Sequence, residues 1–258
     1  MPKKLLVLGL GKMGSWFANR LARFLGEGWI VIGYDKKMDV SLNEVVTEPP
    51  DIVLNCASLD NAVEAFLSVE PVLGEHTVVC DIASIKTRVA NYYTNSGRRF
   101  VSLHPMFGPT FASMERIHGE NVIFIKGSDE ETMALFEEFF ANYSMRFFYL
   151  TFEEHDEMMA YSLSVPFIAS FVFASRVDNT VVPGTTFKKH LDIVTGLLNE
   201  DDKLISEILF NDFSVREIDK IAANLEYLKH IVRDRDHEEL SKFLKKLRVR
   251  IGHGQIQG

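Results

Sequence analysis

A serine and a histidine follow two apolar, strand-like runs, and both residue types can handle a substrate hydroxyl. Ser84 follows the run Thr77–Asp81, and His104 follows the run Phe100–Leu103. The pKa of a histidine lies near neutral pH, so it can take a proton from a hydroxyl whose carbon loses hydride. A serine hydroxyl both donates and accepts, which suits it to orient the same group. By position alone, a structural role for His104 is an equal alternative.

A glycine-rich turn indicates a nucleotide site. Residues 9–14, GLGKMG, end a predicted strand and begin a predicted helix, which is the setting of a dinucleotide-binding fingerprint. Gly9 permits the tight turn, Gly11 lets the backbone approach a pyrophosphate, and Gly14 lets helix and strand pack closely. The helix N-terminus brings amides and partial positive charge to the phosphates. A plain glycine turn is the weaker alternative.

An acidic residue ends the second predicted strand. Asp35 lies roughly 20 residues after the fingerprint, where the motif places the carboxylate that binds the ribose hydroxyls. This carboxylate repels a 2′-phosphate, so we expect NAD; NADP is the alternative, because Lys36 and Lys37 partly offset the repulsion. With two residues that follow the next strand, the predicted cofactor-binding set is Gly9, Gly11, Lys12, Met13, Gly14, Asp35, Ala57 and Ser58.

The first 150 residues alternate β-branched runs with amphipathic segments. Crossovers of this length require parallel strands, so we expect an α/β fold with a Rossmann-type doubly wound parallel sheet. The predicted strands are Lys4–Leu8, Trp29–Tyr34, Ile52–Cys56, Thr77–Asp81, Phe100–Leu103, Val122–Ile125 and Phe147–Leu150. The predicted helices are Lys12–Phe24, Asn61–Ser68, Ile85–Tyr93 and Glu130–Asn142.

Helical periodicity takes over near Thr151, so we expect a nucleotide-binding domain of residues 1–150 and an all-helical domain of residues 151–258. Apolar seams recur at steps of three and four residues: Ile218, Ile221, Leu225, Leu228 and Val232, then Leu240, Phe243, Leu244 and Leu247. A helical region of about a hundred residues has a small interior, so we expect a homodimer. Closure of the seams within one chain is the alternative.

Composition restricts the class of protein. Of the 258 residues 47% are apolar, and 36 acidic against 28 basic residues give a net charge of −8, which argues against a nucleic-acid or anionic-membrane surface. No apolar run approaches the ~18 to 20 residues that cross a bilayer, and no export signal is visible. Cys56 and Cys80 lack the spacing of a zinc site. We expect a cytoplasmic protein with reduced thiols and no metal.

Four motifs, in this order, resemble the prephenate dehydrogenase family of tyrosine biosynthesis. They are GLGKMG at 9–14, DIASIK at 81–86, HPMFGP at 104–109, and EHD at 154–156 leading into MAY at 159–161. The resemblance covers roughly the first two thirds of the chain, and HPMFGP is its most specific motif. It implies a Rossmann domain, a helical dimerisation domain, and NAD-dependent oxidative decarboxylation of prephenate to 4-hydroxyphenylpyruvate. Arogenate is the alternative substrate.

The resemblance also implies roles for single residues. His104 would accept the hydrogen bond of the ring hydroxyl during hydride loss, and Ser84 would brace hydroxyl and nicotinamide together. Lys86 would lie near the substrate carboxylates, with a solvated lysine at a helix start as an equal alternative. His155 is expected to be an interdomain or capping residue rather than a catalyst.

The chain departs from many family members at two substrate-binding positions. Phe167 stands where they carry a histidine, and Gly196 where they carry an arginine that grips a carboxylate. A substrate with two carboxylates needs a cationic partner, so another base must substitute. We predict Lys188, with Lys189 and Arg176 in reserve; solvated surface lysines are the alternative.

Other classes stay open. A β-hydroxyacid dehydrogenase shares the two-domain plan, but its catalytic lysine segment is not recognisable in this sequence. A non-catalytic NAD-binding regulatory protein would explain Phe167 and Gly196, whereas the retained Ser84 and His104 favour an enzyme. The chain could also be a module of a longer polypeptide, because residues 252–258 look like a linker or tag remnant.

Overall fold

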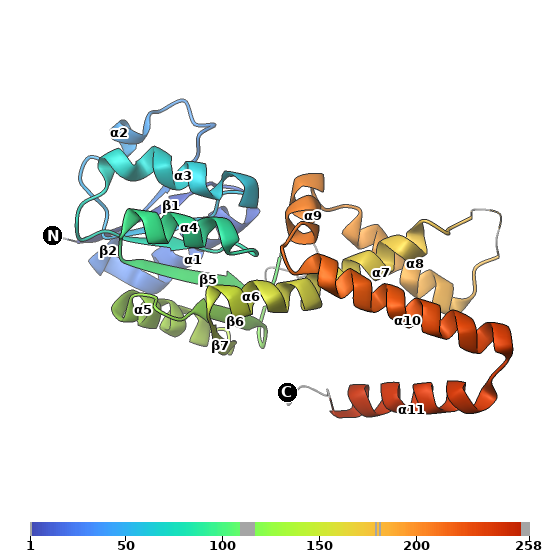
Figure 1. Ribbon diagram of the computed structural model, residues 1–258. Coiled ribbons are helices and arrows are strands. Elements are labelled where there is room, and N and C mark those ends of the chain that lie inside the picture. The colour runs from blue at the N-terminus through green and yellow to red at the C-terminus, as the bar shows by residue number, and fades with distance from the viewer. Residues whose placement is uncertain (1, 109–116, 179, 181, 254–258) are drawn as a thin grey trace.

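The computed structural model describes residues 2–108, 117–178, 180 and 182–253. A sheet covered by helices forms the first part, and a group of helices extends from it (Figure 1). The strands are β1 Lys3–Leu8, β2 Trp29–Tyr34, β3 Ile52–Asn55, β4 Val78–Asp81, β5 Phe100–Pro105, β6 Asn121–Ile125 and β7 Arg146–Leu150. The α-helices are α1 Lys12–Leu25, α2 Leu42–Val45, α3 Ala62–Val69, α4 Thr87–Ser96, α5 Glu130–Ala141, α6 Phe152–Met159, α7 Val165–Ala174, α8 Thr185–Leu197, α9 Asp202–Leu209, α10 Ser214–Asp234 and α11 His237–His253.

The sheet order is β2-β1-β3-β4-β5-β6-β7, and all seven predicted strands are present. The chain runs outward in both directions from β1, which pairs in parallel with β2 and with β3. Such a switch point opens a crevice at the carboxyl ends of the strands, where doubly wound sheets bind ligands. One pair corrects the all-parallel expectation, because β6 runs antiparallel to β5. None of the described residues between these two strands forms a helix, so the crossover argument did not apply there.

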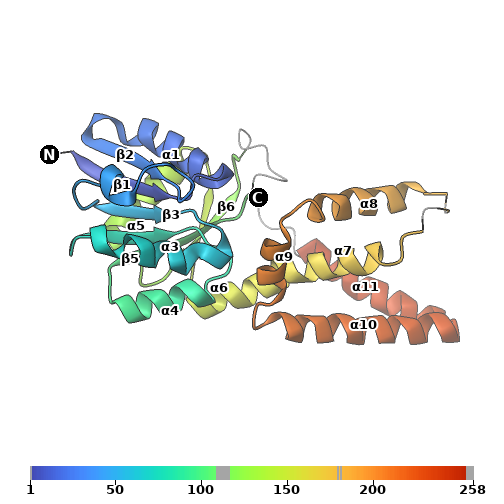
Figure 2. The same cartoon turned by 90° about the horizontal axis from the view of Figure 1, so that it is seen from above.

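The two faces of the sheet carry separate apolar cores, because alternate residues of a strand point to opposite sides. On one face Leu5 packs in a cluster with Phe17 of α1 and Phe139 of α5. On the other face the next residue, Leu6, packs in a cluster with Phe66 of α3. Helices therefore cover both faces, and the sheet is doubly wound (Figure 2).

Every described element after β7 is helical. Thr151 caps α6 and, with Glu154, forms a capping box, so the change from strand to helix is built into the sequence at this point. A π-helical turn, Ala160–Ser164, joins α6 to α7 and carries the chain away from the sheet. The division of the chain into domains at residue 150 stays a prediction.

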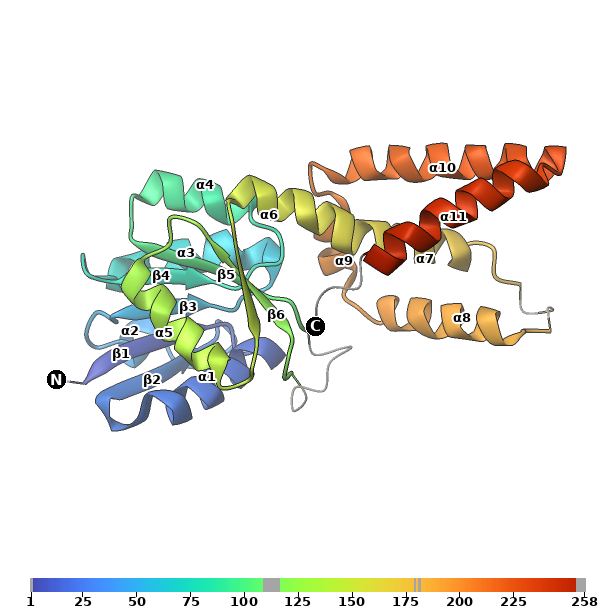
Figure 3. The same cartoon turned by 90° about the horizontal axis from the view of Figure 1, so that it is seen from below.

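The predicted apolar seams lie on α10 and α11, and α11 turns back toward the sheet (Figure 3). The rings of Tyr227 and Phe243 join the two helices at 5.7 Å between centroids. Much of the α10 seam nevertheless stays open, since Leu225 is 59% and Val232 is 70% exposed. The described chain therefore does not close this seam by itself.

One helical run corrects the expectation that no segment is long and apolar enough to cross a bilayer. The run Phe152–Ala174 passes that test by length and composition, and 22% of its most apolar window is buried. The acidic residues of this run lie in its first turns, so they interrupt the apolar pattern there and leave the rest of the run apolar. Two of those first-turn residues, His155 and Asp156, are buried against the sheet region.

Candidate active site

The glycine turn lies at the switch point of the sheet. Gly9 has a φ of 80°, and a Cβ there would lie 2.9 Å from the Ala57 amide nitrogen after β3. A Cβ on Gly14 would lie 1.8 Å from the carbonyl oxygen of Gly9, so α1 packs directly on the turn. A Cβ on Gly11 would meet nothing within 4 Å. Packing therefore requires glycine at the first and last positions, whereas Gly11 leaves backbone open to a ligand.

A cavity of about 1070 Å³ opens beside this turn. Its nucleotide-side wall contains most of the predicted site residues: Gly11, Lys12, Met13, Ala57, Ser58, Ser84 and His104. The opposite wall comes from the helical region: Leu163, Phe167, Glu200, Asp201, Leu204 and Ile208. The structure thus brings the glycine turn, Ser84 and His104 to one cavity, whose volume suits a cofactor with a small substrate.

Asp35 is fixed beside the glycine turn. Its carboxylate accepts the Lys37 amide at 3.0 Å and the Leu10 amide at 2.8 Å. These two backbone hydrogen bonds lower the pKa of Asp35, so the group is ionised near neutral pH. An ionised carboxylate at this place can accept hydrogen bonds from ribose hydroxyls and repel a 2′-phosphate.

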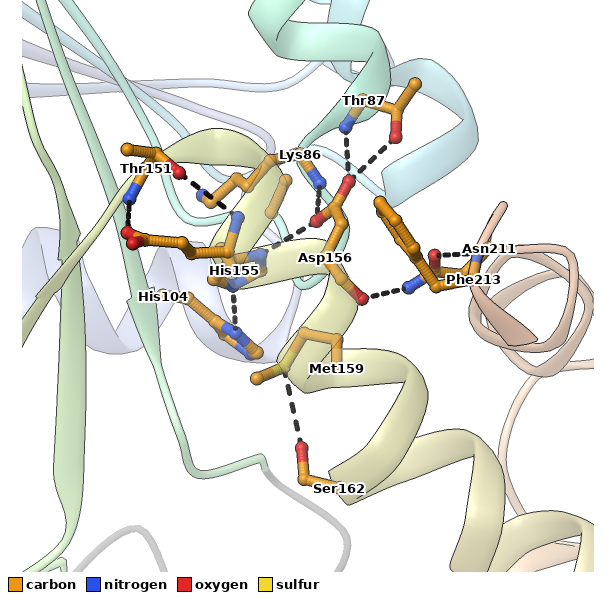
Figure 4. A network of polar contacts seen from close by, with 12 residues as sticks. Lys86, Thr87, His104, Thr151, His155, Asp156, Met159, Ser162, Asn211 and Phe213 are labelled. Atoms are coloured by element: carbon orange, nitrogen blue, oxygen red, sulfur yellow. Dashed lines mark hydrogen bonds and ion pairs between the residues drawn. The ribbon is translucent and has the colours of Figure 1, made fainter. Parts of the chain in front are cut away.

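His104 lines the cavity from the end of β5 and is 7% exposed. Its Nδ1 lies 3.0 Å from Nε2 of His155, whose Nδ1 lies 2.8 Å from Oδ1 of Asp156 (Figure 4). Burial, then the nearby His155 and Lys86, lower the pKa of His104 well below its ordinary value. His104 is therefore neutral near pH 7, as an acceptor for a hydroxyl must be.

Lys86 occupies neither of the positions predicted for it. Its side chain is fully buried, and Nζ donates to Oδ1 of Asp81 at 2.6 Å and to the carbonyl of Leu103 at 2.8 Å. The other carboxylate oxygen of Asp81 accepts the hydroxyl of Tyr93 at 2.7 Å. The amine thus stabilises the strand that carries His104, which corrects the prediction that Lys86 binds substrate.

The residues predicted to replace the missing arginine are not brought to the cavity in the described chain. Lys188, Lys189 and Arg176 are exposed and lie outside the cavity wall. Within the described residues, the helical wall contributes two acidic side chains, Glu200 and Asp201, and no basic one. Phe167 does line this wall.

Sequence reasoning missed several residues of the site. Asp156 was quoted only as part of a motif, although its place in the first turns after β7, beside His155, was a usable signal. Glu200 and Asp201 belong to no motif, and only the fold brings them opposite His104. Pro109, the last residue of HPMFGP, lies outside the described residues, as does the segment 254–258.

Comparisons with known proteins agree with this geometry. Residues 25–149 match the sequence model of the family described as "Prephenate dehydrogenase, nucleotide-binding domain". The T-protein of Enterobacter agglomerans is 25% identical over 219 residues, which are 81% of this chain and 56% of that protein. The T-protein of Haemophilus influenzae is 21% identical over 221 residues, again 81% and 56%. The chain therefore spans a little over half the length of these curated relatives.

Solved structures with the same architecture cover nearly the whole chain. A prephenate dehydrogenase from A. aeolicus, in complex with hydroxyphenyl propionate and NAD+, aligns with a TM-score of 0.80 at 20% identity over 98% of both chains. The arogenate dehydrogenase of Synechocystis aligns with a TM-score of 0.74 at 16% identity, over 97% of this chain and 99% of that one. The resemblance predicted from the motifs is thus confirmed: residues 25–149 match the prephenate dehydrogenase nucleotide-binding domain, and the described chain has the fold of solved prephenate and arogenate dehydrogenases.

Proposed function

We propose that this chain is an NAD-dependent dehydrogenase that oxidatively decarboxylates prephenate to 4-hydroxyphenylpyruvate. The observation that carries the proposal is the neutral His104, which shares one cavity with Ser84 and the open backbone at Gly11. The match to the nucleotide-binding domain and the fold shared with an NAD+-bound prephenate dehydrogenase support it. When bound, NAD+ supplies the acceptor for the hydride that leaves the substrate ring.

In this proposal each residue has a limited task. Gly11 and the start of α1 bind the pyrophosphate, and Asp35 binds the ribose hydroxyls. Ser84 orients the ring hydroxyl, and His104 accepts its hydrogen bond while the carbon bearing it loses hydride. The ring carboxylate leaves as carbon dioxide, and the electron pair of the broken bond completes the aromatic ring. Because aromatisation drives the reaction, the protein needs to orient the substrate and polarise its hydroxyl rather than to activate a strong nucleophile.

Arogenate, the amino counterpart of prephenate, is the second candidate substrate. The observation that favours it is the acidic helical wall of Glu200 and Asp201. Carboxylates repel the two carboxylates of prephenate but attract an ammonium group. The same residue set therefore suits a substrate that carries an amine.

The exposed seam on α10 supports a homodimer as the working form. Leu225 and Val232 leave apolar surface open that a second copy can cover, in the way expected of helical domains with small interiors. We propose a soluble, cytoplasmic biosynthetic dimer.

The test is to mix the full chain with NAD+ and either prephenate or arogenate, and to follow the absorbance of reduced nicotinamide. Turnover of one of the two substrates with release of carbon dioxide supports the proposal, and the ratio of kcat/KM values decides between them. A flat trace with both substrates, while NAD+ still binds, would favour the regulatory class.

A further inference from the structure

A buried chain of three side chains leads from the cavity into the protein: His104, His155 and Asp156. His155 is fully buried and Asp156 is 2% exposed, so neither can touch a substrate. The rings of His104 and His155 lie 5.2 Å apart, with the nitrogens pointing at one another as Figure 4 shows. A buried hydrogen-bonded chain has a defined proton on each link, and these protons can be assigned from the carboxylate outward.

Asp156 is the fixed end of the chain. Its carboxylate accepts the Lys86 amide at 2.8 Å, the Thr87 amide at 2.8 Å and the Thr87 hydroxyl at 2.7 Å. Burial opposes ionisation, but the hydrogen bonds from His155, Thr87 and Lys86 prevail and lower the pKa of Asp156. An ionised carboxylate can only accept. The Nδ1 of His155, at 2.8 Å, must therefore carry a proton.

The next link follows from the charge of His155. Burial outweighs the hydrogen bond that His155 donates to Asp156 and lowers the pKa of His155, so the ring is neutral near pH 7. A neutral imidazole with a proton on Nδ1 has a free lone pair on Nε2. This nitrogen must accept from Nδ1 of His104, 3.0 Å away. The neutral His104 ring is then left with its own Nε2 unprotonated.

The backbone that carries His155 and Asp156 is held by hydrogen bonds on both sides. Thr151 caps the helix that carries His155 and Asp156, and its hydroxyl accepts the Glu154 amide at 3.1 Å. From the helical region, the side chain of Asn211 donates to the carbonyl of Asp156 at 2.7 Å. The helix that carries His155 and Asp156 is therefore held in place by contacts both at its start and from the helical region.

We propose that His155 and Asp156 are positioning residues that hold His104 in the tautomer with its proton on Nδ1, so that Nε2 is the acceptor for the substrate hydroxyl. This assignment rests on the proposed function for the identity of the hydroxyl. The tautomer itself is a property of the protein without substrate. Positive charge that develops on His104 is also stabilised by the carboxylate of Asp156 through His155.

A matched pair of substitutions at His155 tests the proposal. The oxygen of a glutamine can take the place of Nε2 and accept from Nδ1 of His104, whereas leucine fills the space and accepts nothing. We expect His155→Leu to lower kcat by roughly ten- to a hundredfold, less than loss of the acceptor itself. We expect His155→Gln to recover at least about tenfold of that loss, with KM for NAD+ unchanged in both. Equal kcat values for the two folded variants would overturn the proposal.

A second readout does not depend on activity. In the full chain labelled with 15N at histidine, the His104 signals are identified by their loss in His104→Asn. We expect a protonated Nδ1 and an unprotonated Nε2 in the wild type, and a mixture of tautomers in His155→Leu. A proton on Nε2 of wild-type His104 would overturn the assignment. The expected tautomer in a protein that oxidises neither prephenate nor arogenate would reject the proposed function and leave the positioning role intact.

Discussion

The two walls of the cavity are built in different ways. The nucleotide-side wall comes from short loops that follow adjacent strands, and its residues sit where the glycine, DIASIK and HPMFGP motifs place them. The helical wall gathers residues from α7, α9 and the segment before α9, and its charged side chains, Glu200 and Asp201, are both acidic. The contrast teaches that the wall whose residues belong to recognisable motifs could be predicted from the sequence, and that the helical wall, whose residues belong to no motif, could not.

The largest expected effect on turnover comes from a substitution in the nucleotide-side wall. His104→Asn keeps a polar side chain but removes the imidazole nitrogen that can take up a proton from the hydroxyl, so we expect turnover to fall by roughly 10²- to 10⁴-fold with NAD+ affinity unchanged. Steady-state rates and NAD+ titration measure both quantities. Near-normal turnover would make His104 a structural residue and erase the contrast between the walls.

The glycine turn offers a stability comparison. In Gly14→Ala the new Cβ meets the carbonyl of Gly9 at 1.8 Å, so we expect a loss of about 1–3 kcal/mol in the free energy of unfolding, or more. In Gly11→Ala the methyl group meets open space, so we expect an unchanged Tm and roughly tenfold weaker NAD+ binding. Denaturant titration and NAD+ binding of both variants check this. Equal stabilities would mean that α1 does not pack on the turn as described.

The buried histidines predict a pH dependence with a definite sign. Burial lowers the folded-state pKa of both His104 and His155. The unfolded chain therefore binds more protons below pH ~6.5, and stability falls there as pH decreases, by up to about 1.4 kcal/mol per pH unit for each histidine. Activity that needs neutral His104 should persist below pH ~6.5. A kcat/KM profile that titrates at the ordinary histidine pKa would contradict the depressed value.

Cofactor choice depends on Asp35. We expect Asp35→Ser to narrow the preference for NAD+ over NADP+ by roughly tenfold, because repulsion of the 2′-phosphate and a ribose contact are both lost. The ratio of kcat/KM for the two cofactors measures it. Should the wild type already prefer NADP+, Lys36 or Lys37 would dominate over the carboxylate.

The smallest expected effect on kcat/KM comes from a substitution in the helical wall. Glu200→Gln removes one charge from a half-exposed position, so we expect kcat/KM to rise for prephenate or to fall for arogenate by roughly two- to fivefold. Lys188→Met is the matched control, and we expect no change because Lys188 lies outside the cavity. A raised KM in Lys188→Met would return the anion site to α8.

Most of the fold follows from local sequence patterns, and the helical side of the site does not. The seven strands follow from apolar runs in the sequence. The glycine turn follows from glycines at positions where a side chain would clash. The antiparallel β6 was missed because pairing direction depends on the connection rather than on the strand. Lys86 was misplaced because nothing local shows that Asp81 and the carbonyl of Leu103 enclose its amine.

The contact between His104 and His155 also has a consequence for the order of folding. The two residues are 51 positions apart in the chain, and Asn211 reaches back another 55 to the carbonyl of Asp156. Closing loops of this length costs entropy that only completed packing repays. We therefore expect the glycine turn, made from β1 and α1, to form early. The tautomer of His104 should be fixed only later, when α6 docks against the sheet and the helical region is in place. A partly folded chain would then hold nucleotide without being able to use it.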